Sequence, residues 1–353
     1  MTNASLLPWL VADIGGTNAR FGLVRETGGD VGEVRSFRCA DFASPEAAAL
    51  AYLQQLAAPG LDRVRPARVA LALATAIDGD SVQMTNSAWR VSRAAVAQAL
   101  GAAEVVLLND FEALALALPR LANADAVDAV QWIGPARPDR RHTMAVVGPG
   151  TGLGVAACVP AASRGAGLIA PQDEGSAGFT APHDQGSAGC IALPGEGGHA
   201  TLAPADDFES ELLGVLRAEL GHVSAEHVLS GIGLPHLHRA VCRVQGLPVQ
   251  TLGAEAISQR ALVQHDAACI ATLDTFCAML GGFAGNAALT LGARGGVFLA
   301  GGIAQKLGPT LAASRFRARF EAKGRFAVYL SRIATGLIVA PHAALDGAAQ
   351  SLR

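Results

Sequence analysis

The chain has 353 residues, of which 51% are hydrophobic and 16% charged, and its formal net charge is −3. This length exceeds one ordinary hydrophobic core and predicts two domains, or one domain built from two halves. The apolar content excludes a disordered chain. Because no basic cluster lines the sequence, nucleic acid is excluded as a partner.

The N-terminal sequence, MTNASLLPWLVADIGG, lacks the basic start of a signal peptide, and its apolar run breaks at Asp13. No segment offers the ~20 uncharged apolar residues that a bilayer span needs. The cysteines form no CxxC pair, so we expect free thiols in a reducing compartment. These features predict a cytoplasmic protein without membrane contact. The six cysteines are Cys39, Cys158, Cys190, Cys242, Cys269 and Cys277.

Buried strands alternate with helices along the chain. Apolar runs predict strands at 6–12, 21–24, 69–74, 105–108, 144–147, 155–159, 295–299 and 337–339. Helical spacing and end signals predict helices at 45–56, 92–100, 111–118, 207–220, 269–291 and from 343 onward. Ser44 is the expected cap of the first helix, and Pro119 the expected stop of the third. This order predicts an α/β protein with mixed sheets and a cleft between two halves.

The first strand ends in Asp13-Ile14-Gly15-Gly16-Thr17-Asn18, and a second strand follows at once. Adjacent glycines after a buried strand let backbone N–H groups face outward, and Thr17 adds a hydroxyl, as in a phosphate-binding turn. Asp13 could hold water on a Mg²⁺ ion that bridges phosphates. A plain hairpin turn is the alternative. No lysine follows the glycines, so this is not a Walker A loop.

The pattern recurs at Gly148-Pro149-Gly150-Thr151-Gly152-Leu153-Gly154, between the strands 144–147 and 155–159. Aligning Asp13 with Gly148 places turn on turn and strand on strand, which indicates a weak internal repeat. Two such hairpins, one in each half, could hold a triphosphate from both sides of a cleft.

Two further groups of polar residues stand out. Asn109 and Asp110 end a buried strand, where ligands of α/β proteins commonly bind, although both residue types also cap helices. Glu196 and His199 lie three apart on the glycine-rich loop LPGEGGH. They could ligate a metal, but no third ligand is near. Their donors and acceptors suit sugar hydroxyls better.

Taken together, these motifs resemble the bacterial-type glucokinase family, among the sugar kinases of the actin/hexokinase ATPase fold. The matching pieces occur in family order over nearly the whole chain. They are DIGGTNAR (13–20), MTNSAW (84–89), LLNDFEALALALP (107–119), GPGTGLGVA (148–156), LPGEGGH (193–199), RAELGHVSAEHVLSG (217–231) and GGVFLAGGI (295–303).

The resemblance implies a role for each matching position. Asp110 is implied as the catalytic base, acting at an ordinary pKa near ~4. The residues implied to hold the sugar are Asn109, Glu196, His199 and Glu226. The residues implied to bind ATP are Ala12, Asp13, Ile14, Gly15, Gly16 and Thr17 in the first turn, Gly150 and Thr151 in the second, and Gly301 and Gly302 near the nucleoside.

The resemblance also implies an α/β, two-domain, actin/hexokinase-like (ribonuclease-H-like) fold with a central cleft. We expect a small domain of residues 1–119 plus 340–353 and a large domain of 120–339, with a flexible insertion at about 162–189. The implied activity is ATP- and Mg²⁺-dependent phosphorylation of glucose at the 6-hydroxyl, by a homodimer. No cysteine cluster follows His199, so no structural zinc is expected.

Three alternatives stay open on the sequence. The acceptor could be another hexose or an amino sugar, and the donor could be polyphosphate. A sugar-sensing protein without catalysis could use the same fold. Only twelve residues precede Asp13 in this sequence, which we take as no room for the DNA-binding domain of such repressors. The pairing of Asp110 with Asn109 favours catalysis.

Overall fold

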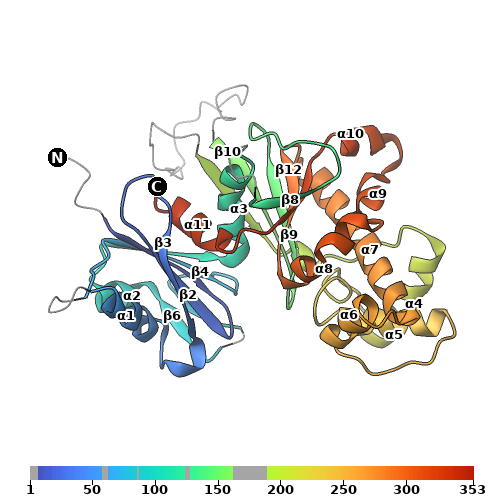
Figure 1. Cartoon of the computed structure of the whole chain (residues 1–353), viewed down its shortest axis with the longest axis horizontal. Helices are drawn as coiled ribbons and strands as arrows, with labels where there is room; N and C mark the ends of the chain where they lie inside the picture. Colours follow the sequence, from blue (N-terminus) through green and yellow to red (C-terminus); the bar gives the residue numbers. More distant parts are fainter. Residues whose placement is uncertain (1–6, 58–62, 86, 124–127, 162–188) are drawn as a thin grey trace, which may run out of the picture.

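The computed structural model describes residues 7–57, 63–85, 87–123, 128–161 and 189–353. Two lobes, each built on one sheet, make up this part of the chain (Figure 1). The expected insertion lies almost wholly outside the described residues. The first sheet has the order β3-β2-β1-β4-β7. Its strands are β1 Trp9–Ile14, β2 Asn18–Val24, β3 Gly32–Arg38, β4 Arg68–Leu73 and β7 Glu104–Asn109.

The second sheet has the order β11-β10-β9-β12-β13-β8. Its strands are β8 Val130–Ile133, β9 Met144–Pro149, β10 Leu153–Pro160, β11 Cys190–Gly195, β12 Gly296–Leu299 and β13 Thr335–Ile338. A separate two-stranded pair consists of β5 Ser81–Gln83 and β6 Arg90–Ser92.

The two sheets repeat one topology. In each, an antiparallel three-strand unit continues into two parallel strands: β3-β2-β1-β4-β7 in the first and β11-β10-β9-β12-β13 in the second. Asp13 and Gly148 each occupy the next-to-last position of the strand before the glycine turn. The internal repeat predicted from two short turns is therefore confirmed.

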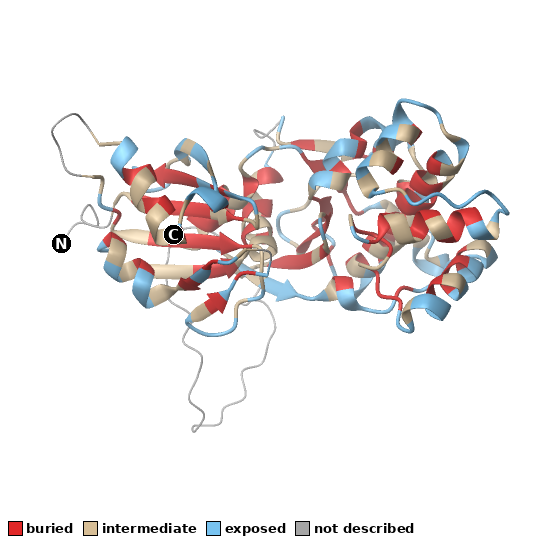
Figure 2. Cartoon of the chain, turned by 90° about the horizontal axis from the view of Figure 1, so that it is seen from below, coloured by how far each residue is buried: buried red, intermediate tan, exposed pale blue. Residues whose placement is uncertain are grey.

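Helices pack around the sheets, and at the far end of the second lobe they pack against one another (Figure 2). Ser44 caps the first helix through Ala47 N–H, as predicted. The second helix ends at Leu100, as predicted, and Gly101 closes it with a φ of 74°. The helices are α1 Pro45–Gln55, α2 Arg93–Leu100, α3 Asp110–Leu121, α4 Asp207–Leu220, α5 Leu234–Val244, α6 Ala254–Leu262, α7 Ala267–Leu291, α8 Gly302–Ala313, α9 Phe316–Glu321, α10 Ala327–Ser331 and α11 Ala343–Gln350.

The predicted stop at Pro119 is wrong, because α3 continues through it to Leu121. A proline so near the end of a helix removes one backbone hydrogen bond only. The side chains of Leu118 and Leu121 are buried, and this burial supports the last turn.

The prediction that all six cysteines are free is wrong for Cys158 and Cys190, which form a disulfide. Antiparallel pairing of β10 with β11 brings their Cα atoms to 5.9 Å although 32 positions separate them in sequence. The pairing of two strands this far apart in sequence has no local signal. The other four cysteines are free and buried.

Helix α7 is the core helix of the second lobe, and it is long and apolar enough to cross a membrane by length and composition. Asp274 lies within this helix, so the expectation that no segment has ~20 uncharged apolar residues is not contradicted. Most of the helix is buried against neighbouring elements of the lobe. Gly281 and Gly285 allow the backbone of α9 to approach closely, because an added methyl group would overlap the carbonyl oxygen of Phe316 or come within 2.6 Å of that of Phe320. We interpret α7 as a core helix.

Candidate active site

The first glycine turn joins β1 to β2. Gly15 N–H donates to Asn18 O at 2.9 Å and closes the turn, while Thr17 is exposed. The side chains of Ala12 and Ile14 are fully buried in the core, so only their backbones are available to a ligand.

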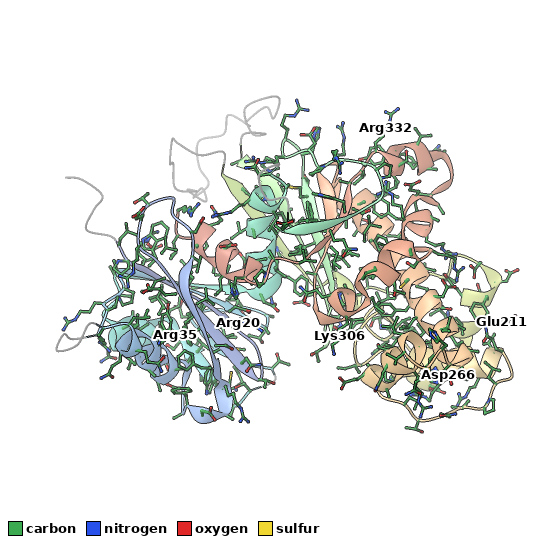
Figure 3. All side chains as sticks on the ribbon, viewed as in Figure 1. Arg20, Arg35, Glu211, Asp266, Lys306 and Arg332 are labelled. Atoms are coloured by element: carbon green, nitrogen blue, oxygen red, sulfur yellow. A yellow bond between two sulfur atoms is a disulfide. The ribbon has the colours of Figure 1, made fainter. Side chains whose placement is uncertain are left out.

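Asp13 pairs directly with Arg20 across the β1–β2 hairpin, and Arg20 Nη1 lies 2.9 Å from Asp13 Oδ2. Arg20 belongs to the first lobe, and Lys306 of α8 to the second (Figure 3). Arg20 is a cation beside the first turn, and reasoning from residue types did not single it out. Its position opposite Asp13 in the hairpin is the signal that could have done so.

Asn109, the last residue of β7, is the N-cap of α3. Its Oδ1 accepts from Phe111 N–H at 2.9 Å, and Glu112 Oε2 accepts from Asn109 N–H at 3.3 Å, which completes a capping box. Asn109 Nδ2 donates to Thr75 O at 3.1 Å and ties this corner to the end of β4. Asn109, and not Asp110, is therefore the N-cap of α3. Asp110 Oδ1 also accepts a hydrogen bond from Phe111 N–H, at 3.1 Å.

The carboxyl group of Asp110 is not an ordinary one. Burial raises its pKa to about 6, and the nearby negative charge of Asp13 acts in the same direction. The expectation of an ordinary pKa is therefore wrong, because the sequence does not reveal how deeply the strand end is buried. Burial also raises the pKa of Asp13, while Arg20 opposes this shift. Asp13 is near enough to influence Asp110 because β1, β4 and β7 are parallel neighbours that end at the same edge.

The second glycine turn is supported from two sides. Gly231 N–H donates to Gly150 O at 2.8 Å, and Gly150 N–H donates to Gly152 O at 2.9 Å. Gly301 has a φ of 87°, and a methyl group added there would lie 2.5 Å from Pro149 O. Only glycine fits this contact. The structure thus brings the nucleoside turn predicted at Gly301 and Gly302 against the second phosphate turn.

Three of the predicted sugar residues form one cluster. His199 Nε2 lies 3.8 Å from Glu196 Oε2, and His199 Nδ1 lies 4.0 Å from Glu226 Oε1. Glu196 and His199 are exposed, whereas Glu226 is half-buried because its Oε2 accepts from Leu153 N–H at 2.8 Å. Within the described part of the chain, Glu196 and His199 keep exposed donors and acceptors on the open side of the cluster, as sugar hydroxyls require.

Two of the predicted groups, the sugar cluster and the helix of Asp110, contact the β9–β10 hairpin. Glu226 contacts it at Leu153, and Phe111, the residue after Asp110, packs against Gly148 and Gly154. The hairpin thus carries the sugar cluster and the helix of Asp110 together. Sequence reasoning missed the contacts of Phe111 and Leu153, because neither residue has a polar side chain.

Comparison with known proteins agrees with this geometry. The family model Glucokinase matches residues 10–188 and 175–353. A glucokinase from Chromobacterium violaceum is 42% identical over 346 residues, which cover 98% of this chain and 89% of that protein. The crystal structure of a glucokinase from an Antarctic psychrotroph superposes with a TM-score of 0.82 at 35% identity, with 98% of each chain covered.

A more distant structure, a ROK family glucokinase from Streptomyces griseus in complex with glucose and AMPPNP, has a TM-score of 0.56 at 18% identity and covers 98% of this chain and 99% of that one. It shares the fold. The class defined by the fold is that of sugar kinases with an actin/hexokinase-like architecture, as predicted. Within this class, the chain belongs to the Glucokinase family.

Proposed function

We propose that this chain transfers the γ-phosphate of ATP to the 6-hydroxyl of glucose, with Asp110 as the base. The observation that carries the proposal is the position of two groups on one hairpin. Glu226 of the sugar cluster binds Leu153, and the residue after Asp110 packs on Gly148 and Gly154. An acceptor sugar and a carboxylate base would then meet beside a turn suited to phosphate.

In this mechanism the bond from the sugar O6 to the γ-phosphorus forms as the bond from that phosphorus to the bridging oxygen of ADP breaks. The hydroxyl proton passes to the carboxylate of Asp110. Phosphoryl transfer asks a protein mainly for positioning and charge stabilisation. A base whose pKa is about 6 is ionised at neutral pH and is stronger than an ordinary aspartate.

We assign sugar hydroxyls to Asn109, Glu196, His199 and Glu226. The phosphates are assigned to the backbone of the first turn, Ala12 to Thr17, and to Gly150 and Thr151 of the second. Gly301 and Gly302 are assigned to the nucleoside side, since Gly301 abuts Pro149. Arg20 adds a cation beside the first turn.

Asp13 also fits Mg²⁺, which binds through one or two carboxylates together with phosphate oxygens and water. When bound, the ion would neutralise charge on the phosphates and on this carboxylate, and Asp110 would stay free to act as the base. Among the described residues no group of three His, Cys, Asp or Glu side chains could hold a metal by itself.

The deciding assay measures glucose-dependent formation of ADP with Mg²⁺. Wild type is expected to turn over, and Asp110→Asn is expected to lose most of the rate while still binding glucose. Retention of most activity by Asp110→Asn would refute the assignment of the base. Calorimetric binding of glucose by wild type without turnover would instead favour a sugar-sensing protein. A panel of hexoses, amino sugars and polyphosphate under the same conditions tests the substrate and the donor.

We further propose that residues 1–119 with 340–353 form the small domain and 120–339 the large one, and that the two close on the substrates. The family resemblance supports a cytoplasmic homodimer. Light scattering at working concentration tests the dimer, and small-angle scattering with and without glucose tests the closure.

A further inference from the structure

The four glycines of the second turn differ in what a side chain would meet there. A methyl group at Gly150 would meet nothing within 4 Å. At Gly152 it would overlap the carboxylate of Glu226. At Gly148 and at Gly154 it would overlap the ring of Phe111. Open space for a phosphate thus exists at Gly150, whereas Gly148 and Gly154 make room for an aromatic ring.

Gly148 and Gly154 are direct partners in the β9–β10 ladder. Because directly opposed residues share one face of a sheet, their missing side chains leave a single notch. The ring of Phe111 occupies this notch and also packs against the hydrophobic cluster between α3 and the second sheet. A ring seated in a notch on the face of two paired strands has little freedom to shift.

The backbone of Phe111 is tied to the base. Its N–H donates to Asp110 Oδ1 at 3.1 Å and to Asn109 Oδ1 at 2.9 Å. Asp110 itself follows directly on β7, a strand of the first sheet. The base therefore extends from one sheet, while the next residue is seated in the other.

We propose that Phe111 is a positioning residue that sets the distance between the base and the second phosphate turn. The proposal rests on the assignment of Asp110 as base. It gives the glycines at 148 and 154 a role other than phosphate binding. A purely structural ring would contribute to stability alone, whereas a positioning ring must also affect the chemical step.

The first test replaces the ring by Phe111→Leu and Phe111→Ala. We expect kcat at saturating glucose and ATP to fall about tenfold to 100-fold, since a displacement of about 1 Å can cost that much. The KM for ATP should change less than kcat. Phe298→Leu is the matched control, because Phe298 is buried in the same cluster, whereas the atoms nearest to a methyl group at Gly148 or Gly154 belong to Phe111 and Ala300. It should lower the melting temperature and preserve kcat.

The second test uses Gly154→Ala, which pushes on the ring without altering it, and the double variant Gly154→Ala/Phe111→Ala. If the added methyl acts through the ring, Gly154→Ala should reduce kcat in the wild-type background and have little further effect once the ring is gone. Gly214→Ala, on an exposed position of α4 with open space around it, is the control substitution.

Additive losses in the double variant, or near-normal kcat in Phe111→Leu with a lowered melting temperature, would overturn the proposal. Failure of the underlying function has a separate signature. In that case wild type does not phosphorylate glucose, or Asp110→Asn remains active, whatever the Phe111 variants do.

Discussion

Glu226 Oε2 accepts a hydrogen bond from the backbone N–H of Leu153 at 2.8 Å, across 73 positions of sequence. The other oxygen, Oε1, lies 4.0 Å from His199 Nδ1. One carboxylate thus contacts the second glycine turn and the cluster to which we assign the sugar. The turn is held further by Gly231 N–H, which donates to Gly150 O. Sugar binding and phosphate binding are therefore expected to be coupled through Glu226.

Gly152→Ala tests this coupling, because the added methyl would overlap Glu226 Oε2 and displace it from Leu153. We expect the KM for glucose and the KM for ATP each to rise about tenfold, the effect of losing one hydrogen bond to a charged group. Steady-state kinetics with both substrates varied measures the two constants.

Glu226→Gln provides the contrast, since its amide oxygen can still accept from Leu153 N–H. It should raise the KM for glucose and leave the KM for ATP close to that of wild type. Equal effects of both variants on the two substrates, or no effect of Gly152→Ala on glucose, would show that the contact does not couple the sites.

The raised pKa of Asp110 predicts the pH dependence of the reaction. A base must be deprotonated, so kcat/KM for glucose should fall about tenfold per pH unit below pH 6 and level off above it. Part of the shift comes from Asp13, so Asp13→Asn should move the acid limb of its residual activity to lower pH. Rate measurements from pH 4 to 8.5 decide this. If the acid limb of the wild type were centred near pH 4, the pKa of Asp110 would not be raised by burial, and the prediction would be wrong.

The same shift predicts a stability effect with a definite sign. The pKa of Asp110 is higher in the folded protein than the ordinary 3.8, so the folded state disfavours the ionised form. The resulting cost is absent below about pH 3.8 and is complete above about pH 6. Asp110→Asn should therefore raise the free energy of unfolding by about 1–3 kcal/mol at pH 8 and by little at pH 4. Urea denaturation at both pH values measures this, and an equal effect at both would rule out the ionic cause.

Much of this architecture follows from local sequence. The glycine turns, the Ser44 cap and the end of α2 at Gly101 are set by residues within a few positions of each other, and all three are read correctly. The repeat of the two sheets could be inferred because both turns follow a buried strand. The wrong stop at Pro119 is a local error, whereas three other failures share one cause, which is contact between distant segments.

The pairing of Cys158 with Cys190 depends on the register of β10 with β11. The pKa of Asp110 depends on burial and on Asp13, almost a hundred positions away. The position of the Phe111 ring depends on Gly148 and Gly154, which belong to the other lobe. In each case the sequence shows the residue but not its neighbour.

The disulfide makes a prediction about thiols. Denatured but unreduced protein should present four reactive thiols, from Cys39, Cys242, Cys269 and Cys277, and reduction should raise this number to the six of the sequence. Reduction should also lower the free energy of unfolding by about 2–4 kcal/mol, as for a disulfide that closes a loop of this size. Disulfides are rare in a reducing cytoplasm. Six reactive thiols before reduction would contradict the disulfide and support the prediction from sequence that all six cysteines are free.

The capping box of α3 separates a stabilising role from a positioning role. Glu112→Ala removes the acceptor of Asn109 N–H and loosens the corner that holds Asp110. We expect it to lower the free energy of unfolding by about 1 kcal/mol and to reduce kcat as well. Ser44→Ala is the matched control, because it removes the cap of α1, a helix far from Asp110 in sequence. We expect it to lower the free energy of unfolding by a similar amount. Thermal melts and kcat values of the two variants decide the matter. If both lose the same stability and both keep full kcat, the capping box stabilises α3 without positioning the base.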